Sequence, residues 1–146
     1  MRARFLTLTA FIAIFWLGTV IGVSFLASPI KFTAETLTRE AAFDVGRVTF
    51  QAFAMLEWAL AALMLVTALM ARSNIKILIA PIALTLLVAF QGVNLLPALD
   101  VRADMVIAGH EPPASWHHMA YVWAEGAKVI LLLGSAFVFQ TMSRRS

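Results

Sequence analysis

Five of the polar residues inside the apolar runs of this sequence are, by their types, the best candidates for chemistry. Glu57, Glu125 and Lys128 are ionisable, and Gln91 and Asn94 carry amide groups. A charge in a hydrocarbon core costs about 2.5–3.5 kcal/mol even on a lenient scale, so it should face protein and find a partner. Glu125 and Lys128 are three residues apart, which allows an ion pair on one helix face. We predict that the five form one ligand, ion or proton cluster.

Two interpretations of this cluster stay open. It is either a working site or a polar clasp that locks helices together, although such interhelical bonds contribute only about 0.6 kcal/mol on average. Two carboxylates against one ammonium leave a negative charge unmatched, so one acid holds a proton or a cation binds. Arg47 could fold back to supply that charge. Tyr121 and His118 continue the helix face of Glu125 and are secondary candidates.

A metal site at the histidines is a weaker hypothesis. His117 and His118 could ligate a metal together with His110, Glu111 or Glu125. Adjacent histidines on a helix, however, point about 100° apart. No His-x-x-x-His or Glu-x-x-His pair is present, and a haem would need facing axial ligands that the sequence does not suggest. We therefore predict no cofactor.

Several other functions find no support in the sequence. The chain contains no cysteine, which excludes disulfides, iron–sulfur clusters and thiolate chemistry. No hydrolase, kinase or dinucleotide-binding motif is present, so an enzyme is not favoured. No cluster of basic and aromatic residues indicates nucleic-acid binding.

The elements that must hold the polar cluster are four long apolar runs. Hydrophobic residues make up 62% of the 146 residues and charged residues 13%, against about 25% charged in soluble domains. Each run has about the 20 residues that cross a bilayer core. The sequence thus predicts a single all-α domain, a four-helix transmembrane bundle. We predict spans at 5–28, 52–71, 77–96 and 119–141, outer loops at 29–51 and 97–118, and an inner turn at 72–76.

The distribution of charges predicts the orientation of the bundle. One side has only basic residues, and the other mixes four basic residues with six acidic ones. By the positive-inside rule, the first side is cytoplasmic and the protein lies in the inner (plasma) membrane with both termini inside. The polar cluster then falls in the outer half. The residues of the basic side are Arg2, Arg4, Arg72, Lys76, Arg144 and Arg145.

Local signals refine the helix ends. Thr38 resembles an N-cap, and one helix could run from it to Ala71, protruding from the bilayer or bending near Gly46. Pro112-Pro113 is expected to end the second outer loop and start the last helix. Gly18-x-x-x-Gly22 is a close-packing pattern, which we interpret as packing within the bundle, with self-association as the alternative.

Short motifs along most of the chain resemble a known family. They are Phe15-Trp16-Leu17-Gly18 followed by Pro29 and Phe32, then Asn94-Leu95-Leu96-Pro97 with Arg102, then a histidine before the last helix. They resemble the small four-helix membrane proteins grouped with transmembrane protein 205, a family of unknown function with a possible distant link to copper-resistance protein D membrane domains. The resemblance implies a four-helix bundle and no established activity. It singles out Pro29, Asn94, Pro97, Arg102 and His118.

Three functions remain compatible with the sequence. The near-absence of any soluble part favours a non-enzymatic accessory or assembly subunit of a membrane complex, with other membrane subunits or further copies of itself as partners. The polar cluster motivates a small transport or ion-handling protein as the first alternative. A metal- or haem-linked membrane redox protein is the second.

Overall fold

A computed structural model describes residues 1–71 and 75–145, and in these residues the chain forms helices and no strand. It contains four continuous helical stretches that are long and apolar enough to cross a membrane. The predicted all-α architecture is confirmed at this level. The first stretch comprises α1 (Arg2–Val20), η1 (Ile21–Ala27), α2 (Ser28–Ile30) and η2 (Lys31–Thr33); the second is α3 (Arg39–Met70); the third comprises η3 (Ile75–Leu78), α4 (Ile79–Phe90), η4 (Gln91–Leu95) and α5 (Leu96–Ile107); the fourth is α6 (His117–Arg144).

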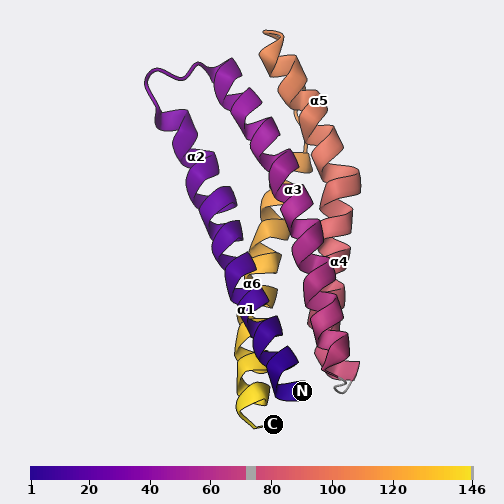
Figure 1. Ribbon diagram of the computed structural model, residues 1–146. Coiled ribbons are helices and arrows are strands. Elements are labelled where there is room, and N and C mark those ends of the chain that lie inside the picture. Colours follow the sequence, from indigo (N-terminus) through magenta and orange to yellow (C-terminus); the bar gives the residue numbers. More distant parts are fainter. Residues whose placement is uncertain (72–74, 146) are drawn as a thin grey trace.

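The four stretches run side by side as a bundle with both termini at one end (Figure 1). The hydroxyls of Thr7 and Ser143 are 2.6 Å apart, and the Ser143 hydroxyl donates to the carbonyl of Ala3, so α1 and α6 are joined at this terminal end. The opposite end, which we name the loop end, carries the connections 34–38 and 108–116. Of the predicted inner turn, residues 72–74 lie outside the described residues.

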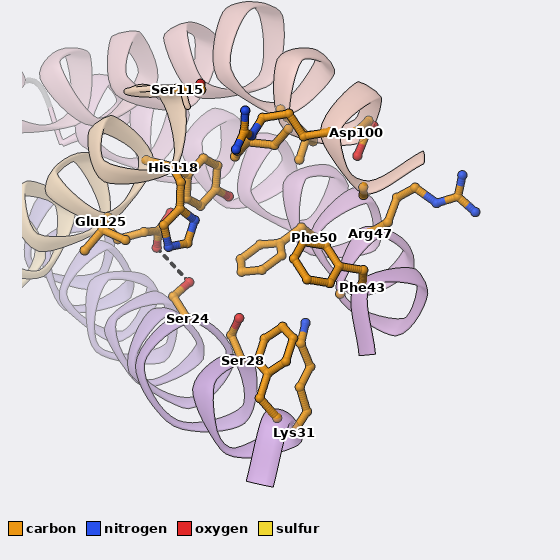
Figure 2. A pocket seen from close by; sticks show the side chains of 18 of the residues that line it. Ser24, Ser28, Lys31, Phe43, Arg47, Phe50, Asp100, Ser115, His118 and Glu125 are labelled. Carbon is orange, nitrogen blue, oxygen red and sulfur yellow. Dashed lines mark hydrogen bonds between the residues drawn. The ribbon is translucent and has the colours of Figure 1, made fainter. Parts of the chain in front are cut away.

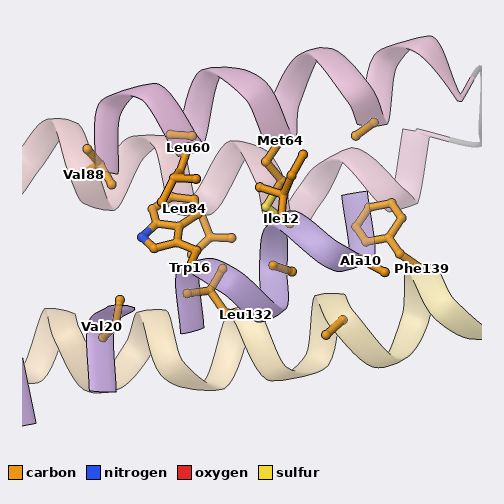
Figure 3. Close-up of a cluster of buried hydrophobic side chains, with 14 of the residues drawn as sticks. Ala10, Ile12, Trp16, Val20, Leu60, Met64, Leu84, Val88, Leu132 and Phe139 are labelled. Carbon is orange, nitrogen blue, oxygen red and sulfur yellow. The ribbon is translucent and has the colours of Figure 1, made fainter. Parts of the chain in front are cut away.

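The apolar core fills the half of the bundle toward the terminal end (Figure 3). Trp16 of α1 is fully buried and lies among Leu60, Leu84 and Leu132, which come from the other three long helices. Thr9 and Thr67 add a buried hydroxyl hydrogen bond of 3.0 Å between α1 and α3. Because each long helix contributes to this cluster, the core fixes their mutual rotation and thereby the direction of the polar side chains beyond it.

The helices extend further toward the loop end than predicted. The Thr38 hydroxyl accepts the Ala41 N–H at 3.2 Å, as expected of an N-cap, and α3 stays helical through Gly46 without interruption. With 32 residues, α3 is about 48 Å long at 1.5 Å per residue, longer than a bilayer core of about 30 Å. The segments predicted as outer loops, 29–51 and 97–118, are therefore mostly helical.

The second outer loop, predicted to begin at Pro97, is helical at its start. Pro97 follows the π turn η4 within one continuous helical stretch, and the helix continues through it to Ile107. Pro112 and Pro113 lie in the irregular connection, and α6 begins later, at His117. The fourth helix thus starts below the tips of α3 and α5 (Figure 1).

The prediction that Gly18 and Gly22 pack against another helix of the bundle was wrong. A methyl group built at either position would meet nothing within 4 Å. Gly18 is exposed and Gly22 is half-buried. The glycines instead leave a shallow strip of α1 and η1 uncovered on the outside of the bundle.

Candidate functional site: a buried charge triad beneath a cavity

Lys128 lies between two carboxylates inside the bundle. Its ammonium donates a hydrogen bond to Glu57 and pairs with Glu125 at an N–O distance of 2.7 Å. The exposed fractions of Lys128, Glu125 and Glu57 are 0%, 1% and 2%. We name these three residues the charge triad. Such complete burial stabilises charges only when the remaining hydrogen-bonding capacity is also satisfied.

Three neutral side chains donate further hydrogen bonds to the two carboxylates of the triad. The Trp16 indole donates to Glu57 at 3.0 Å. The Gln91 amide donates to one oxygen of Glu125 at 2.8 Å, and the Ser24 hydroxyl donates to the other at 3.0 Å. Each of the four long helical stretches thus supplies at least one side chain, because Ser24 and Trp16 belong to the first, Glu57 to the second and Gln91 to the third.

Both residues that reach Glu125 from neighbouring helices lie in π-helical turns. Ser24 is in η1, where the Ser28 N–H bonds to the Val23 carbonyl, and Gln91 opens η4, where the Leu96 N–H bonds to the Gln91 carbonyl. These i→i+5 bonds widen one turn of an otherwise α-helical segment. Single π turns of this kind are rare and frequently mark functional sites, and here two of them converge on one carboxylate.

Two of the predicted cluster residues are not part of this arrangement. Asn94 is exposed, and its amide donates to the Phe90 carbonyl of its own helix at 3.4 Å. Gln91 and Asn94 would share a face of a regular α-helix, but the π turn between them rotates Asn94 away. Arg47 does not fold back to the triad either, because Asp44 and Asp104 hold it at 2.6 and 2.7 Å near the loop end.

A cavity of about 820 Å³ opens above the triad at the loop end. It occupies the space left free because α6 starts lower than α3 and α5 end (Figures 1 and 2). Figure 2 shows Glu125 and Ser24 at one side of this space, with Phe43, Phe50 and Lys31 across from them. Glu125 is the member of the triad that lines the cavity. We name this space the loop-end cavity.

The secondary candidates on α6 belong to the cavity wall. Tyr121 and His118 lie one and two turns before Glu125 and line the cavity with it. His117 points elsewhere: its Nδ1 hydrogen-bonds the Ser115 hydroxyl and its ring stacks on Trp116. Within the described ranges, no group of three His, Cys, Asp or Glu residues is placed to hold a metal ion.

Comparisons with family models, curated proteins and solved structures returned no match. The resemblance to the transmembrane protein 205 group therefore stays a prediction. Of the positions that it singles out, Arg102 donates to the Pro113 carbonyl and joins α5 to the loop before α6. His118 and Arg102 line the cavity, whereas Asn94 does not.

Ion pairs surround the mouth of the cavity. Arg39 forms two hydrogen bonds with Glu111, one of them at 3.1 Å, and so joins the start of α3 to the connection 108–116. The guanidinium holds the pKa of the Glu111 carboxyl below its ordinary value through this hydrogen bond and its charge. Arg47 bridges Asp44 and Asp104, which ties α3 to α5. These ion pairs thus connect α3 at the mouth both to the connection 108–116 and to α5.

Sequence reasoning missed two contributors to the site, Trp16 and Lys31. Trp16 donates to Glu57, but nothing distinguishes its position from that of an ordinary core tryptophan. Ser24 was expected at the depth of the polar cluster, and the structure adds its hydrogen bond to Glu125. Lys31 was assigned to a loop, and only the helical path of residues 28–33 turns it toward the cavity.

Proposed function

We propose that this protein binds a small molecule in the loop-end cavity and that the charge triad gains or loses a proton as the cavity fills and empties. It would then be a small solute-binding or transport protein of a membrane. The observation that carries this proposal is that Glu125 is both a carboxylate of the triad and part of the cavity wall. A ligand in the cavity can act on the triad through that residue.

The net charge of the triad supports the proposal that it binds a proton. Two carboxylates and one ammonium sum to one negative charge, and no second basic side chain of the described chain pairs with the triad. An unmatched charge buried inside the bundle is costly, so a proton or a small cation has to balance it. A site whose occupancy changes the surroundings of Glu125 would shift that balance, which is the basis of proton-linked binding.

We further propose that the loop end faces outward and the terminal end faces the cytoplasm, in the inner membrane. The support is the purely basic terminal end and the mixed loop end. Because the chain lacks cysteine, single substitutions report the topology cleanly. A membrane-impermeant thiol reagent added to intact cells should label Ala108→Cys and spare Arg145→Cys, two positions that are both exposed. The reverse pattern would refute the orientation.

Reaction with a carbodiimide tests whether Glu125 carries a proton. Dicyclohexylcarbodiimide enters apolar sites and adds to a protonated carboxyl: the acid proton moves to nitrogen, the oxygen bonds to carbon, and rearrangement leaves a stable acylurea with every atom retained. We expect peptide mapping to find this adduct on Glu125, with a yield that falls as the pH rises. If the Lys128 amine attacks first, urea leaves and a Glu125–Lys128 amide appears in the same map.

The controls for this experiment come from the triad itself. Glu125→Gln keeps the shape and the acceptor oxygen but removes the acid, so it should lose the modification. Glu57 is enclosed by Trp16 and Lys128 and should react far more slowly. An unmodified Glu125 at every pH, with only loop-end carboxylates labelled, would reject a protonated triad that is open to the cavity.

An accessory or assembly role remains a second proposal, and the uncovered strip at Gly18 and Gly22 favours it. Glycines let helix backbones approach closely in membranes, so this strip suits another transmembrane helix. Native mass spectrometry after mild extraction tests this role. A bound subunit or a second copy that is lost in Gly18→Ile would support it, and a monodisperse monomer would oppose it.

A further inference from the structure

Lys31 is a cation of the cavity wall that has no carboxylate partner. The Lys31 ammonium lies 5.1 Å from the ring centre of Phe32 and 6.0 Å from that of Phe50. No salt bridge involves it in the described part of the chain. Figure 2 shows the side chain extending beside Phe43 and Phe50 with its nitrogen toward the cavity. Aromatic faces compensate an ammonium only partly, so its capacity for a full counter-charge is unused.

Gly46 of α3 makes this position of Lys31 possible. A methyl group at Gly46 would collide with the Lys31 ammonium. The end of the first helical stretch, at the short turn η2, places Lys31 directly opposite this gap. The lysine therefore lies across α3 inside the cavity wall instead of extending into solvent.

The other charges of the wall are largely neutralised. Arg39 and Arg47 are paired with carboxylates at the mouth, and Glu125 has Lys128 beneath it. Arg102 donates to a backbone carbonyl, which leaves its positive charge unmatched. Asp100 accepts the Gln51 amide at 3.0 Å and keeps its negative charge. Lys31 and Arg102 are thus the two wall cations without a carboxylate partner, and Lys31 is the one whose ammonium lies against aromatic rings.

The apolar part of the wall is aromatic. Phe32 and Phe43 make an edge-to-face contact with ring centres 5.6 Å apart, and Phe50 and Tyr121 make another at 5.4 Å. All four rings line the cavity. Such faces suit a flat apolar body, and a volume of about 820 Å³ lies within the usual range of small-molecule pockets, about 300–1,000 Å³.

From these features we infer that the cavity takes an amphipathic monoanion: an aromatic carboxylate whose acid group pairs with Lys31 and whose ring lies among the phenylalanines. This assignment of the ligand class rests on the proposed function. The ligand enters from the loop end with its acid group near the mouth, where water still reaches it. Its apolar end points inward to Tyr121 and the region above Glu125.

Three probes with one body and different head charges test the inference. Phenylpropionate, phenylpropanol and phenylpropylamine are titrated into the purified full chain by calorimetry at constant ionic strength. We expect phenylpropionate to bind about tenfold more tightly than the alcohol, since a charge-assisted bond at a partly buried ammonium contributes about 1.5 kcal/mol or more. The amine should bind most weakly.

Variants identify the residue responsible. Lys31→Gln should abolish the preference for the acid, and Lys31→Arg should retain it because the positive charge is kept. Lys76→Gln, at the terminal end and outside the cavity, is the matched control and should bind like the unmodified protein. Circular dichroism of each variant confirms that its helices are intact.

The remaining outcomes overturn the inference in separable ways. Equal binding of acid and alcohol would show that the cavity does not recognise the charge. Tighter binding of the amine would make a wall carboxylate, Asp100 or Glu125, the counter-ion and would leave the proposed function standing. If none of the three probes binds, the ligand class is rejected. The carbodiimide reaction at Glu125 tests the proton-linked triad independently of this result. A preference that survives in Lys31→Gln would remove Lys31 from the site.

Discussion

Replacing Lys128 with methionine is expected to be the most destabilising single substitution in the polar cluster. Methionine fills a similar volume, but it leaves Glu57 and Glu125 facing each other without the ammonium that both contact. Removing one partner of a buried ion pair typically costs about 3–5 kcal/mol because the other charge stays buried and uncompensated. The unfolding midpoint of the purified protein in a denaturing detergent titration should fall accordingly.

A triple variant separates the charge effect from a packing defect. Glu57→Gln and Glu125→Gln added to Lys128→Met remove every charge of the triad and keep its shape. This variant should recover most of the lost stability, since well-packed neutral replacements of buried ion pairs are often neutral or stabilising. Should the single and triple variants unfold at the same midpoint, the loss would come from packing around Lys128 and not from unpaired carboxylates.

The same pair of variants bears on whether the triad is a clasp or a working site. A pure clasp predicts that the restored triple variant behaves like the unmodified protein in every assay. A working site predicts that it is stable but has lost proton-linked behaviour, because no titratable group is left beneath the cavity. Stability and proton exchange measured on one protein therefore discriminate between two interpretations that the sequence left open.

The meeting of the triad residues could be inferred from the sequence because it depends on few physical rules. Ionisable side chains avoid lipid, so they turn inward. Glu57, Glu125 and Lys128 lie at similar depths when each residue of a helix advances the chain by about 1.5 Å. Depth and inward direction together leave little freedom in a bundle of four helices, and the structure places the three side chains in contact.

The cavity could not be inferred in the same way. Residues 29–51 and 97–118 are polar enough to suggest loops, yet most of them continue the helices beyond the length that a bilayer core requires. The cavity exists because α6 begins at His117 while α3 and α5 reach further. Relative helix ends depend on packing and on contacts such as Arg39–Glu111 and Arg47–Asp104, which link residues far apart in the sequence.

Asn94 shows why one residue of the predicted cluster was misplaced. The argument from spacing assumed about 100° of rotation for every residue of a helix. The π turn at η4 holds one residue more than an α turn, so residues on its two sides no longer keep α-helical phase. The one sequence feature that goes with it is a proline two residues after the π turn, Pro97 after η4 and Pro29 after η1, whose ring would clash with the carbonyl four residues earlier in a regular α-helix.

Deleting Leu86 from the regular part of α4 is expected to abolish the native fold, because every later residue of the stretch rotates by about 100°. Gln91 and Leu95 would then leave the interior, where they are 2% and 0% exposed. Deleting Val93 from η4 should be milder, since the i→i+5 turn can close into an i→i+4 turn with α5 still facing α3, at the cost of a clash between the Pro97 ring and the Gly92 carbonyl of about 3 kcal/mol. The two deleted side chains are matched in exposure, at 64% and 68%.

Detergent unfolding and circular dichroism of the two deletions measure this contrast. If the Val93 deletion folds and the Leu86 deletion does not, α5 faces α3 without the extra residue of η4. The role of that residue would then be to direct Gln91 toward Glu125. In that case the Val93 deletion should also weaken ligand binding, as α5 moves by about 1.5 Å toward the terminal end. Equal damage from both deletions would mean that the π turn sets the rotation of α5, and the cavity would then depend on η4 for its shape as well as for its carboxylate contact.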